Sequence, residues 1–152
     1  MHLKIPMVRA EGASIPLHAT EHSAGYDLCA LLDRPFTLEP GQRHLFSTGL
    51  RLAIPNGFFG MVCPRSGLAL KTGVTVLNAP GIIDADYRGE IGVILVNLGD
   101  KPHTVNPGDR IAQMMFAHAL RTVFIPAFGL RETERGSGGF GSTGLNQENS
   151  RV

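Results

Sequence analysis

One loop of the sequence concentrates acidic and amide side chains. The segment from Asn78 to Glu90 contains both of these residues together with Asp84 and Asp86. In an extended chain Asp84 and Asp86 project from the same face. Two carboxylates so close bind a cation, pair with arginine or raise the pKa of one of them, and each of these suits a catalytic site. The alternative is a turn with no chemistry, which an Asp86–Arg88 pair would brace.

A second cluster, Pro64-Arg65-Ser66-Gly67, comes directly before a segment that we predict to be a short helix. If the helix begins near Ser66, backbone N–H groups, the hydroxyl and the Arg65 guanidinium meet at one end, which favours an anion. The simpler interpretation is that Ser66 only caps the helix.

The third cluster lies in the polar, glycine-rich segment that follows Arg131. Consecutive glycine amides in residues 136–141 can surround a phosphate, Arg135 can add a bidentate hydrogen bond, and Phe140 offers a flat face for stacking. The spelling Gly-x-Gly-x-x-Gly is not a dinucleotide fingerprint here, because that motif requires a preceding strand, a following helix and a later acidic residue. Taken alone, such a segment is typical of a flexible terminus.

Other catalytic patterns are missing from the sequence. It contains no Gly-x-x-x-x-Gly-Lys-Ser/Thr, Gly-x-Ser-x-Gly or His-Glu-x-x-His motif. His18 and His22 lack a third metal ligand nearby, and Cys29 and Cys63 are expected to be core residues rather than a disulfide or a zinc site. These absences favour a water-activating carboxylate that acts on a metal-bound phosphate chain.

Short strands are expected to position these clusters. The chain has 19 glycines and 10 prolines, and turn signals recur about every 8 to 12 residues, which is typical of all-β folds. One short helix is expected from Ser66, stopped by Gly73. The predicted strands are Leu45–Ile54, Phe58–Cys63, Val74–Leu77, Ile91–Leu98 and Arg110–Ala117.

Composition limits the remaining possibilities. The 152 residues are 43% hydrophobic and 18% charged, which predicts one folded domain over residues 1–130 and a mobile arm over residues 131–152. With 14 Lys and Arg against 13 Asp and Glu, the net charge of +1 indicates a small anionic ligand rather than polymeric nucleic acid. No apolar stretch approaches the roughly 20 residues of a membrane span. The first twelve residues do not resemble a signal peptide, so we expect a cytoplasmic protein.

In their order and spacing these clusters resemble the trimeric dUTPases, or dUTP pyrophosphatases. The resemblance implies a distorted β jelly-roll subunit and a homotrimer in which three chains build each active site. It also implies Mg²⁺-dependent hydrolysis of dUTP to dUMP and pyrophosphate, by water attack on the alpha-phosphorus, with the C-terminal arm closing over a neighbour's site. The five motifs that carry it are Ala24–Leu28, Pro64–Ala69, Asn78–Gly89, Gly108–Gln113 and Arg135–Gly144.

The resemblance also implies a role for individual residues. Asp84 orients and deprotonates the attacking water, and Tyr87 packs on the deoxyribose, which excludes a 2′-hydroxyl. Uracil is recognised by Asn78 and by the backbone of Gly81, Ile82, Ile83 and Asp84. The phosphate binders are Arg65, Ser66, Gly67 and Gln113, while Arg135 holds the terminal phosphate and Phe140 stacks on uracil. Mg²⁺ is held mainly by substrate phosphates and water, with Asp27 as indirect support.

Two other functions remain open at this point. A dCTP deaminase would share the fold but needs a different acid arrangement, and Asp84 followed by Tyr87 favours the phosphatase. A nucleotide-sensing protein without turnover would be expected to have lost Asp84, which is present together with Gln113 and Phe140.

Overall fold

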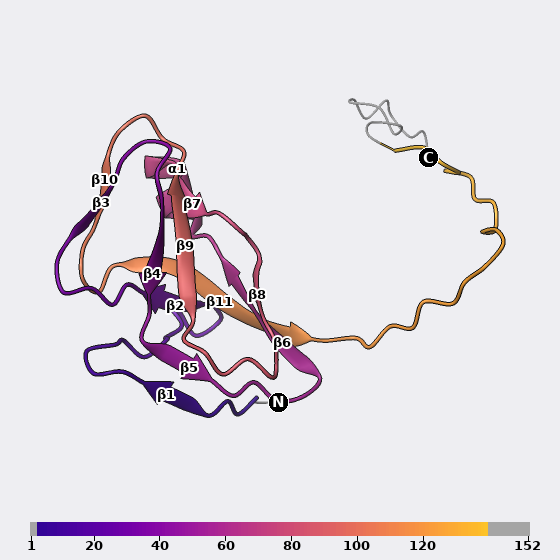
Figure 1. The fold of residues 1–152 in the computed structure, drawn as a ribbon, viewed down its shortest axis with the longest axis horizontal. Helices are drawn as coiled ribbons and strands as arrows, with labels where there is room; N and C mark the ends of the chain where they lie inside the picture. The colour runs from indigo at the N-terminus through magenta and orange to yellow at the C-terminus, as the bar shows by residue number, and fades with distance from the viewer. Residues whose placement is uncertain (1–2, 140–152) are drawn as a thin grey trace. The chain divides into compact units, whose positions relative to one another are not determined.

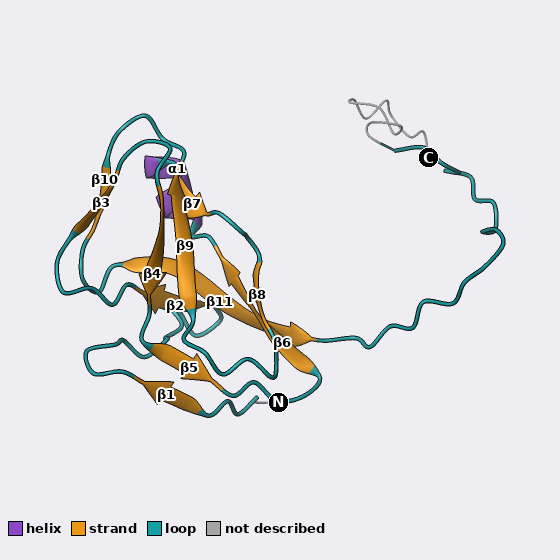
Figure 2. Cartoon of the chain, viewed as in Figure 1, coloured by secondary structure: helices purple, strands orange, loops and turns teal. Residues whose placement is uncertain are grey.

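Short antiparallel strands dominate the computed structural model, which describes residues 3–139 (Figures 1 and 2). Contacts divide the chain after Leu120, and within residues 3–139 all strands and the one helix precede that point. The elements are β1 (Met7–Arg9), β2 (Tyr26–Cys29), β3 (Phe36–Leu38), β4 (Arg43–Ser47), β5 (Leu50–Leu52), β6 (Phe58–Cys63), α1 (Ser66–Thr72), β7 (Val74–Val76), β8 (Gly81–Ile83), β9 (Gly92–Asn97), β10 (His103–Val105) and β11 (Arg110–His118). The predicted all-β class with one short helix is confirmed.

The largest sheet brings together parts of the chain that are far apart in sequence. Its strand order is β2-β11-β6-β8, and the long strand β11 crosses the middle of the view in Figure 1. Gln113 of β11 lies opposite Asp27 on one side and Cys63 on the other. On the far side of β6, Val62 lies opposite Gly81. One sheet therefore carries residues from three of the five sequence motifs, and a fourth, Pro64–Ala69, begins directly after β6.

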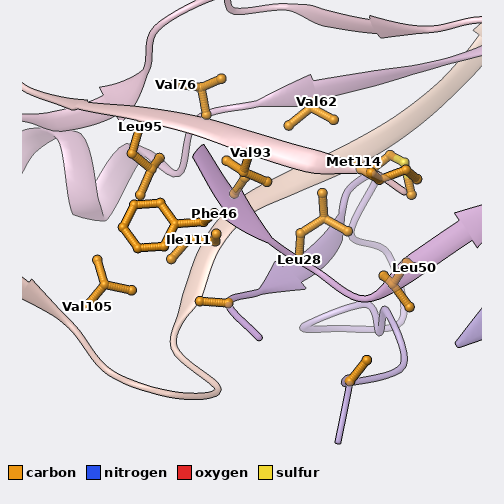
Figure 3. Packing of buried hydrophobic residues seen from close by; sticks show 14 of the residues in the cluster. Leu28, Phe46, Leu50, Val62, Val76, Val93, Leu95, Val105, Ile111 and Met114 are labelled. Atoms are coloured by element: carbon orange, nitrogen blue, oxygen red, sulfur yellow. The ribbon is translucent and has the colours of Figure 1, made fainter. Parts of the chain in front are cut away.

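The hydrophobic core joins this sheet to a second one of order β4-β9-β7. Leu28 and Met114 come from the first sheet, and Phe46, Val93 and Leu95 come from the second; all five are at most 1% exposed. Figure 3 shows these side chains gathered between the strands that carry them. The pairs β1–β5 and β3–β10 complete the strand pairing.

The prediction of one strand over Leu45–Ile54 is wrong, because the chain changes sheets at Gly49. β4 pairs with β9, whereas β5 pairs with β1. Gly49 has a φ of +69°, which side chains disfavour, and a Cβ there would lie 2.7 Å from the Ala13 Cβ. The other four predicted strands are confirmed, with ends that differ by one residue or less.

The helix ends where the sequence predicts but is not capped by Ser66. Arg65 has the extended backbone of the N-cap, and no side-chain hydrogen bond caps this end, so Ser66 is already the first helical residue. At the other end Gly73 adopts a left-handed φ of 74° and its N–H donates to Ala69 O, as a C-terminal glycine usually does. No helix within residues 3–139 is long and apolar enough to cross a membrane.

Candidate active site

Four side chains from three motifs form what we call the arginine cluster: Asp27, Arg65, Arg110 and Gln113. Arg65 Nε lies 3.2 Å from Asp27 Oδ1, and Arg110 Nη1 lies 3.0 Å from Asp27 Oδ2. Arg65 Nη1 also donates to Arg110 O at 3.0 Å. The Asp27 side chain is only 16% exposed, so its charge is compensated by both guanidinium groups. Each guanidinium has five N–H donors, which leaves donors on both arginines for an anion.

Gln113 connects the cluster to the start of the helix. Its Nε2 donates to Pro64 O at 3.0 Å, directly before Arg65. Gly25 lies so close that a Cβ at this position would be 2.5 Å from Gln113 Oε1, so only glycine leaves room for the Gln113 side chain. Ser66 and Gly67 follow Arg65 and are both exposed. A Cβ at Gly67 would meet no atom within 4 Å, so its backbone is open to a ligand.

A second group of predicted residues lies in residues 78–90, which we call the β8 loop. Gly81 is buried against β6, and a Cβ there would lie 3.2 Å from Asn78 Nδ2, so the amide sits against the start of the strand. Ile82 is 52% exposed, whereas Ile83 is half-buried. Within the described residues β8 pairs only with β6, which leaves its outer edge of backbone N–H and C=O groups unpaired.

Asp84 follows the strand and is exposed at the beginning of a turn. Tyr87 N–H donates to Asp84 O at 3.2 Å, so the segment forms a turn, which the sequence leaves open as the alternative to an extended chain with Asp84 and Asp86 on one face. The expected Asp86–Arg88 pair is wrong: both ion pairs within residues 3–139 are those of Asp27. Arg88 Nη1 instead braces the turn through Ala85 O at 2.6 Å and Tyr87 O at 2.9 Å.

The Tyr87 side chain is fixed by the end of the same loop. Its hydroxyl donates to Glu90 O at 2.9 Å, and its ring lies against Gly89, where a Cβ would be 2.6 Å from Tyr87 Cζ. The Glu90 carboxylate accepts hydrogen bonds from Ser47 Oγ and, at 2.9 Å, from Gly49 N. These two bonds, that from Ser47 first, lower the pKa of Glu90 below its ordinary value.

Asp84 and Arg65 lie toward opposite ends of β6, although Gly81 lies opposite Val62, near the Arg65 end. Asp84 follows Ile83, which lies opposite Gly60, whereas Arg65 lies two residues beyond Cys63 at the other end of the strand. About six residues of strand therefore separate Asp84 from Arg65, roughly 20 Å at about 3.3 Å per residue. The structure brings Asp27, Arg65 and Gln113 together, and it places Asn78 beside Gly81 and Tyr87 against Gly89 and Glu90. Within residues 3–139 no hydrogen bond or ion pair joins these β8-loop residues to the arginine cluster.

Residues 121–139 are the described part of the second unit. Arg135 Nε donates to Gly138 O at 2.9 Å, and Gly136 N donates to Thr133 O at 2.9 Å, so Arg135 sits in a local turn. The predicted residue Phe140 lies outside the described residues.

Two residues were missed by the sequence reasoning. Arg110 belongs to a recognised motif, but its contact with Asp27 depends on the register of β11. Glu90 ends the acidic segment, but its partners Ser47 and Gly49 are more than 40 positions away. Within residues 3–139 no group of three or more His, Cys, Asp or Glu side chains could hold a metal ion.

Comparison with known proteins identifies the family. A family model described as dUTPase matches residues 11–144. A deoxyuridine 5'-triphosphate nucleotidohydrolase from Rickettsia felis is 50% identical over 143 residues, 94% of this chain and 97% of that protein. A protein of the same name from Beijerinckia indica subsp. indica is 54% identical over 140 residues, 91% of this chain and 88% of that protein.

Solved structures agree on the fold. A mutant of the dUTPase of phage 80alpha superposes with a TM-score of 0.82 at 24% identity, over 93% of this chain and 99% of that chain. This match confirms the predicted dUTPase-like fold, and the family match confirms the resemblance found in the sequence. The chain belongs to the dUTPase family of hydrolases.

Proposed function

We propose that this chain hydrolyses dUTP to dUMP and pyrophosphate, which removes dUTP from the nucleotide pool and supplies dUMP for thymidylate synthesis. The observation that carries the proposal is the dUTPase match over residues 11–144, which covers both the arginine cluster and the β8 loop. A mutant of the phage 80alpha dUTPase has been solved with dUpNHpp, which supports a deoxyuridine triphosphate as the ligand class.

The β8 loop is proposed to recognise the base and the sugar. The unpaired outer edge of β8, from Gly81 to Ile83, offers fixed N–H and C=O groups that can match the donor and acceptor pattern of uracil and reject cytosine, whose pattern is reversed. The Asn78 amide adds a further polar group at the start of this edge. Tyr87 would pack on the deoxyribose and leave no room for a 2′-hydroxyl.

Asp84 is proposed as the general base. Its exposed carboxylate would accept a proton from a water about 3 Å away. The oxygen of that water then forms a bond to the alpha-phosphorus, and the bond from this phosphorus to the bridging oxygen breaks. Pyrophosphate leaves with that oxygen and dUMP remains.

The arginine cluster is proposed to bind the phosphates. Arg65, with Ser66, Gly67 and Gln113 beside it, would donate hydrogen bonds to phosphate oxygens. Asp27 would act indirectly, because both of its oxygens already pair with arginines that it holds in place. Arg135 of the arm would bind the terminal phosphate, and Phe140 would stack on uracil.

The residues fit a magnesium ion that arrives with the substrate. Both oxygens of Asp27 are engaged by arginine, and residues 3–139 contain no cluster of metal-binding side chains. Mg²⁺ commonly binds through substrate phosphates and water rather than through a cage of side chains. When bound there, it would neutralise charge on the triphosphate. A mutant of the dUTPase from phage phi11 of S. aureus coordinates a structural Mg(II) ion, which supports magnesium in the family.

A homotrimer with shared sites is proposed because, within one chain, Asp84 lies far from Arg65 of the arginine cluster. The base in the β8 loop and the phosphate binders must act on the same alpha-phosphate, yet roughly 20 Å of β6 lies between Asp84 and Arg65. A second copy that supplies its β8 loop to the arginine cluster would resolve this distance. The arm, residues 131–152 beyond the folded domain of residues 1–130, would close over a neighbouring site. We place the enzyme in the cytoplasm, with neither a membrane nor polymeric nucleic acid as partner.

The proposal is tested by incubating purified protein with dUTP, dCTP, dTTP or UTP, each with Mg²⁺, and separating the products by chromatography. We expect dUTP alone to give dUMP and pyrophosphate, with loss of turnover when the metal is chelated. Conversion of dCTP to dUTP would establish the deaminase instead. Binding of dUTP without turnover would indicate a sensor protein. Sedimentation should give about three times the chain mass of 16.3 kDa.

A further inference from the structure

The end of the β8 loop is fastened to the junction between β4 and β5. The Glu90 carboxylate accepts from Ser47 Oγ and from Gly49 N, and we call these three residues the Glu90 anchor. The next residue continues the attachment, because Ile91 N donates to Leu50 O at 2.8 Å and Thr48 Oγ1 donates to Ile91 O at 2.5 Å.

The junction that receives Glu90 is itself firmly placed. Gly49 is buried, and its backbone has the positive φ that turns the chain from one sheet to the other. Gly49 O accepts from Ala10 N at 2.8 Å, and Ser47 O accepts from Leu31 N at 2.8 Å. A carboxylate bound to this junction therefore fixes the position of residue 90 relative to two sheets.

Glu90 also holds Tyr87, the side chain that is proposed to face the sugar. The backbone carbonyl of Glu90 accepts the Tyr87 hydroxyl, and Gly89 supports the ring from one side. Tyr87 is 43% exposed, so the neighbouring core does not lock the ring. The position of the phenol thus depends on where residue 90 is held.

We propose that Glu90 is a positioning residue for substrate specificity: its carboxylate anchors residue 90, and its carbonyl then fixes Tyr87 in the orientation that excludes a 2′-hydroxyl. The inference rests on the proposed packing of Tyr87 against the deoxyribose. Glu90 itself touches neither the substrate nor the attacking water in this scheme. Two arginines support this arrangement. Arg51 of β5 favours the ionised form of the Glu90 carboxylate, and Arg88 holds the turn through its hydrogen bonds to Ala85 O and Tyr87 O.

The test compares Glu90→Ala with Glu90→Gln, because glutamine keeps an Oε1 acceptor for both Ser47 and Gly49. In Glu90→Ala we expect the KM for dUTP to rise about tenfold with little change in kcat, and the preference for dUTP over UTP to fall about tenfold. Glu90→Gln should keep both the KM for dUTP and the preference for dUTP over UTP close to those of the unaltered protein. Glu11→Ala, an exposed glutamate outside the loop, is the matched control and should behave as the unaltered protein. A merely structural role would instead lower the active fraction, and therefore kcat, with KM and preference unchanged.

A second readout does not require turnover. The chain has two tyrosines, so the tyrosine ring signals in an NMR spectrum belong to Tyr26 and Tyr87, and Tyr26→Phe assigns them. The Tyr87 ring signal should shift or broaden in Glu90→Ala and keep its position in Glu90→Gln.

Failure of this inference and failure of the proposed function are distinguishable. If the unaltered protein hydrolyses dUTP while Glu90→Ala keeps its KM, its preference over UTP and its Tyr87 signal, the positioning role is overturned. If the unaltered protein does not hydrolyse dUTP, the proposed function fails, and an unchanged Tyr87 signal in Glu90→Ala would overturn the anchor as well.

Discussion

The arginine cluster and the β8 loop hold their functional groups by opposite means. In the arginine cluster, side chains from β2, β11 and the start of α1 contact one another, and the Asp27–Arg110 contact spans 83 residues of sequence. In the β8 loop, Tyr87 and Arg88 bond to carbonyls only one to three residues away, and the functional side chains are exposed. Glu90 differs from these residues, because its carboxylate accepts hydrogen bonds from the distant β4–β5 junction.

This contrast suits the two proposed tasks, phosphate binding by the arginine cluster and recognition of base and sugar by the β8 loop. Phosphates carry full charges, so a pre-oriented set of guanidinium donors that does not rearrange on binding stabilises them best. A base and a sugar are recognised by shape and by hydrogen-bonding pattern, which an exposed strand edge and a turn can present at the surface. The comparison predicts that substitutions in the β8 loop affect chemistry and selectivity, whereas substitutions in the arginine cluster affect triphosphate binding.

The largest effect is expected from Asp84→Asn. An amide cannot accept the proton of the attacking water, and a general base contributes about 100- to 10,000-fold to the rate, so kcat should fall by at least about 100-fold. Binding of dUTP, measured by calorimetry, should persist because Asn keeps the size of the side chain. Asp86→Asn is the matched control two positions away and should retain activity. Near-normal turnover in Asp84→Asn would remove Asp84 as the base.

The next effect tests whether a third region is needed. Truncation after Glu134 removes Arg135 and Phe140 while leaving every described strand intact. If the arm orders the phosphates and excludes water, activity should fall about 100-fold while sedimentation still shows the trimer. Full activity of the truncated protein would show that the arginine cluster and the β8 loop suffice without an arm.

A smaller effect is expected from Asp27→Asn in the arginine cluster. Loss of the negative charge leaves Arg65 and Arg110 without their common partner, so both guanidinium groups should become less ordered. We expect kcat/KM for dUTP to fall about tenfold, and the dUTP preference over UTP to stay the same because the β8 loop is unchanged. Asp33→Asn, on an exposed loop, is the control. A change in sugar preference would contradict the division between the two regions.

The sequence predicts the parts of this fold that depend on local signals. Strand Phe58–Cys63 and the helix stop at Gly73 follow from residue type alone, and both agree with the structure. Strands of three residues, such as β3 and β10, are defined by pairing with each other rather than by their own composition, and they were not predicted. The break at Gly49 was missed because the residues on both sides of it are equally strand-like.

The candidate site was predicted as a set of residues rather than as a geometry. The motifs name Asp27, Arg65 and Gln113, but their contacts depend on the register of β11, which shifts between Arg110 and Ala112. A shift of one residue would turn Gln113 away from Pro64, and no local pattern reveals it. The turn that contains Asp84 and Asp86 is likewise formed by the bond from Tyr87 N to Asp84 O and by the carbonyl contacts of Arg88, which residue types do not specify.

The smallest effect concerns the pH dependence of stability at Glu90. Because its hydrogen bonds lower the pKa of this carboxyl in the folded protein, the anchor stabilises the fold fully above the ordinary glutamate pKa of about 4.3. That contribution is lost as the pH falls further through the lower pKa of the folded state. Urea unfolding at fixed protein concentration should therefore show the unaltered protein to be more stable than Glu90→Gln at pH 6 to 7, with the difference shrinking below about pH 4.

The matched comparison is Glu11→Gln, which should show no such pH-dependent difference. If the stability difference between the unaltered protein and Glu90→Gln is the same at every pH, the carboxylate does not carry the anchor. The β8 loop would then be held at the β4–β5 junction by the uncharged hydrogen bonds that Glu90→Gln also keeps. If the difference does shrink in acid, one distant charge supports a loop that is otherwise held by contacts with neighbouring residues, as the proposed positioning of Tyr87 requires.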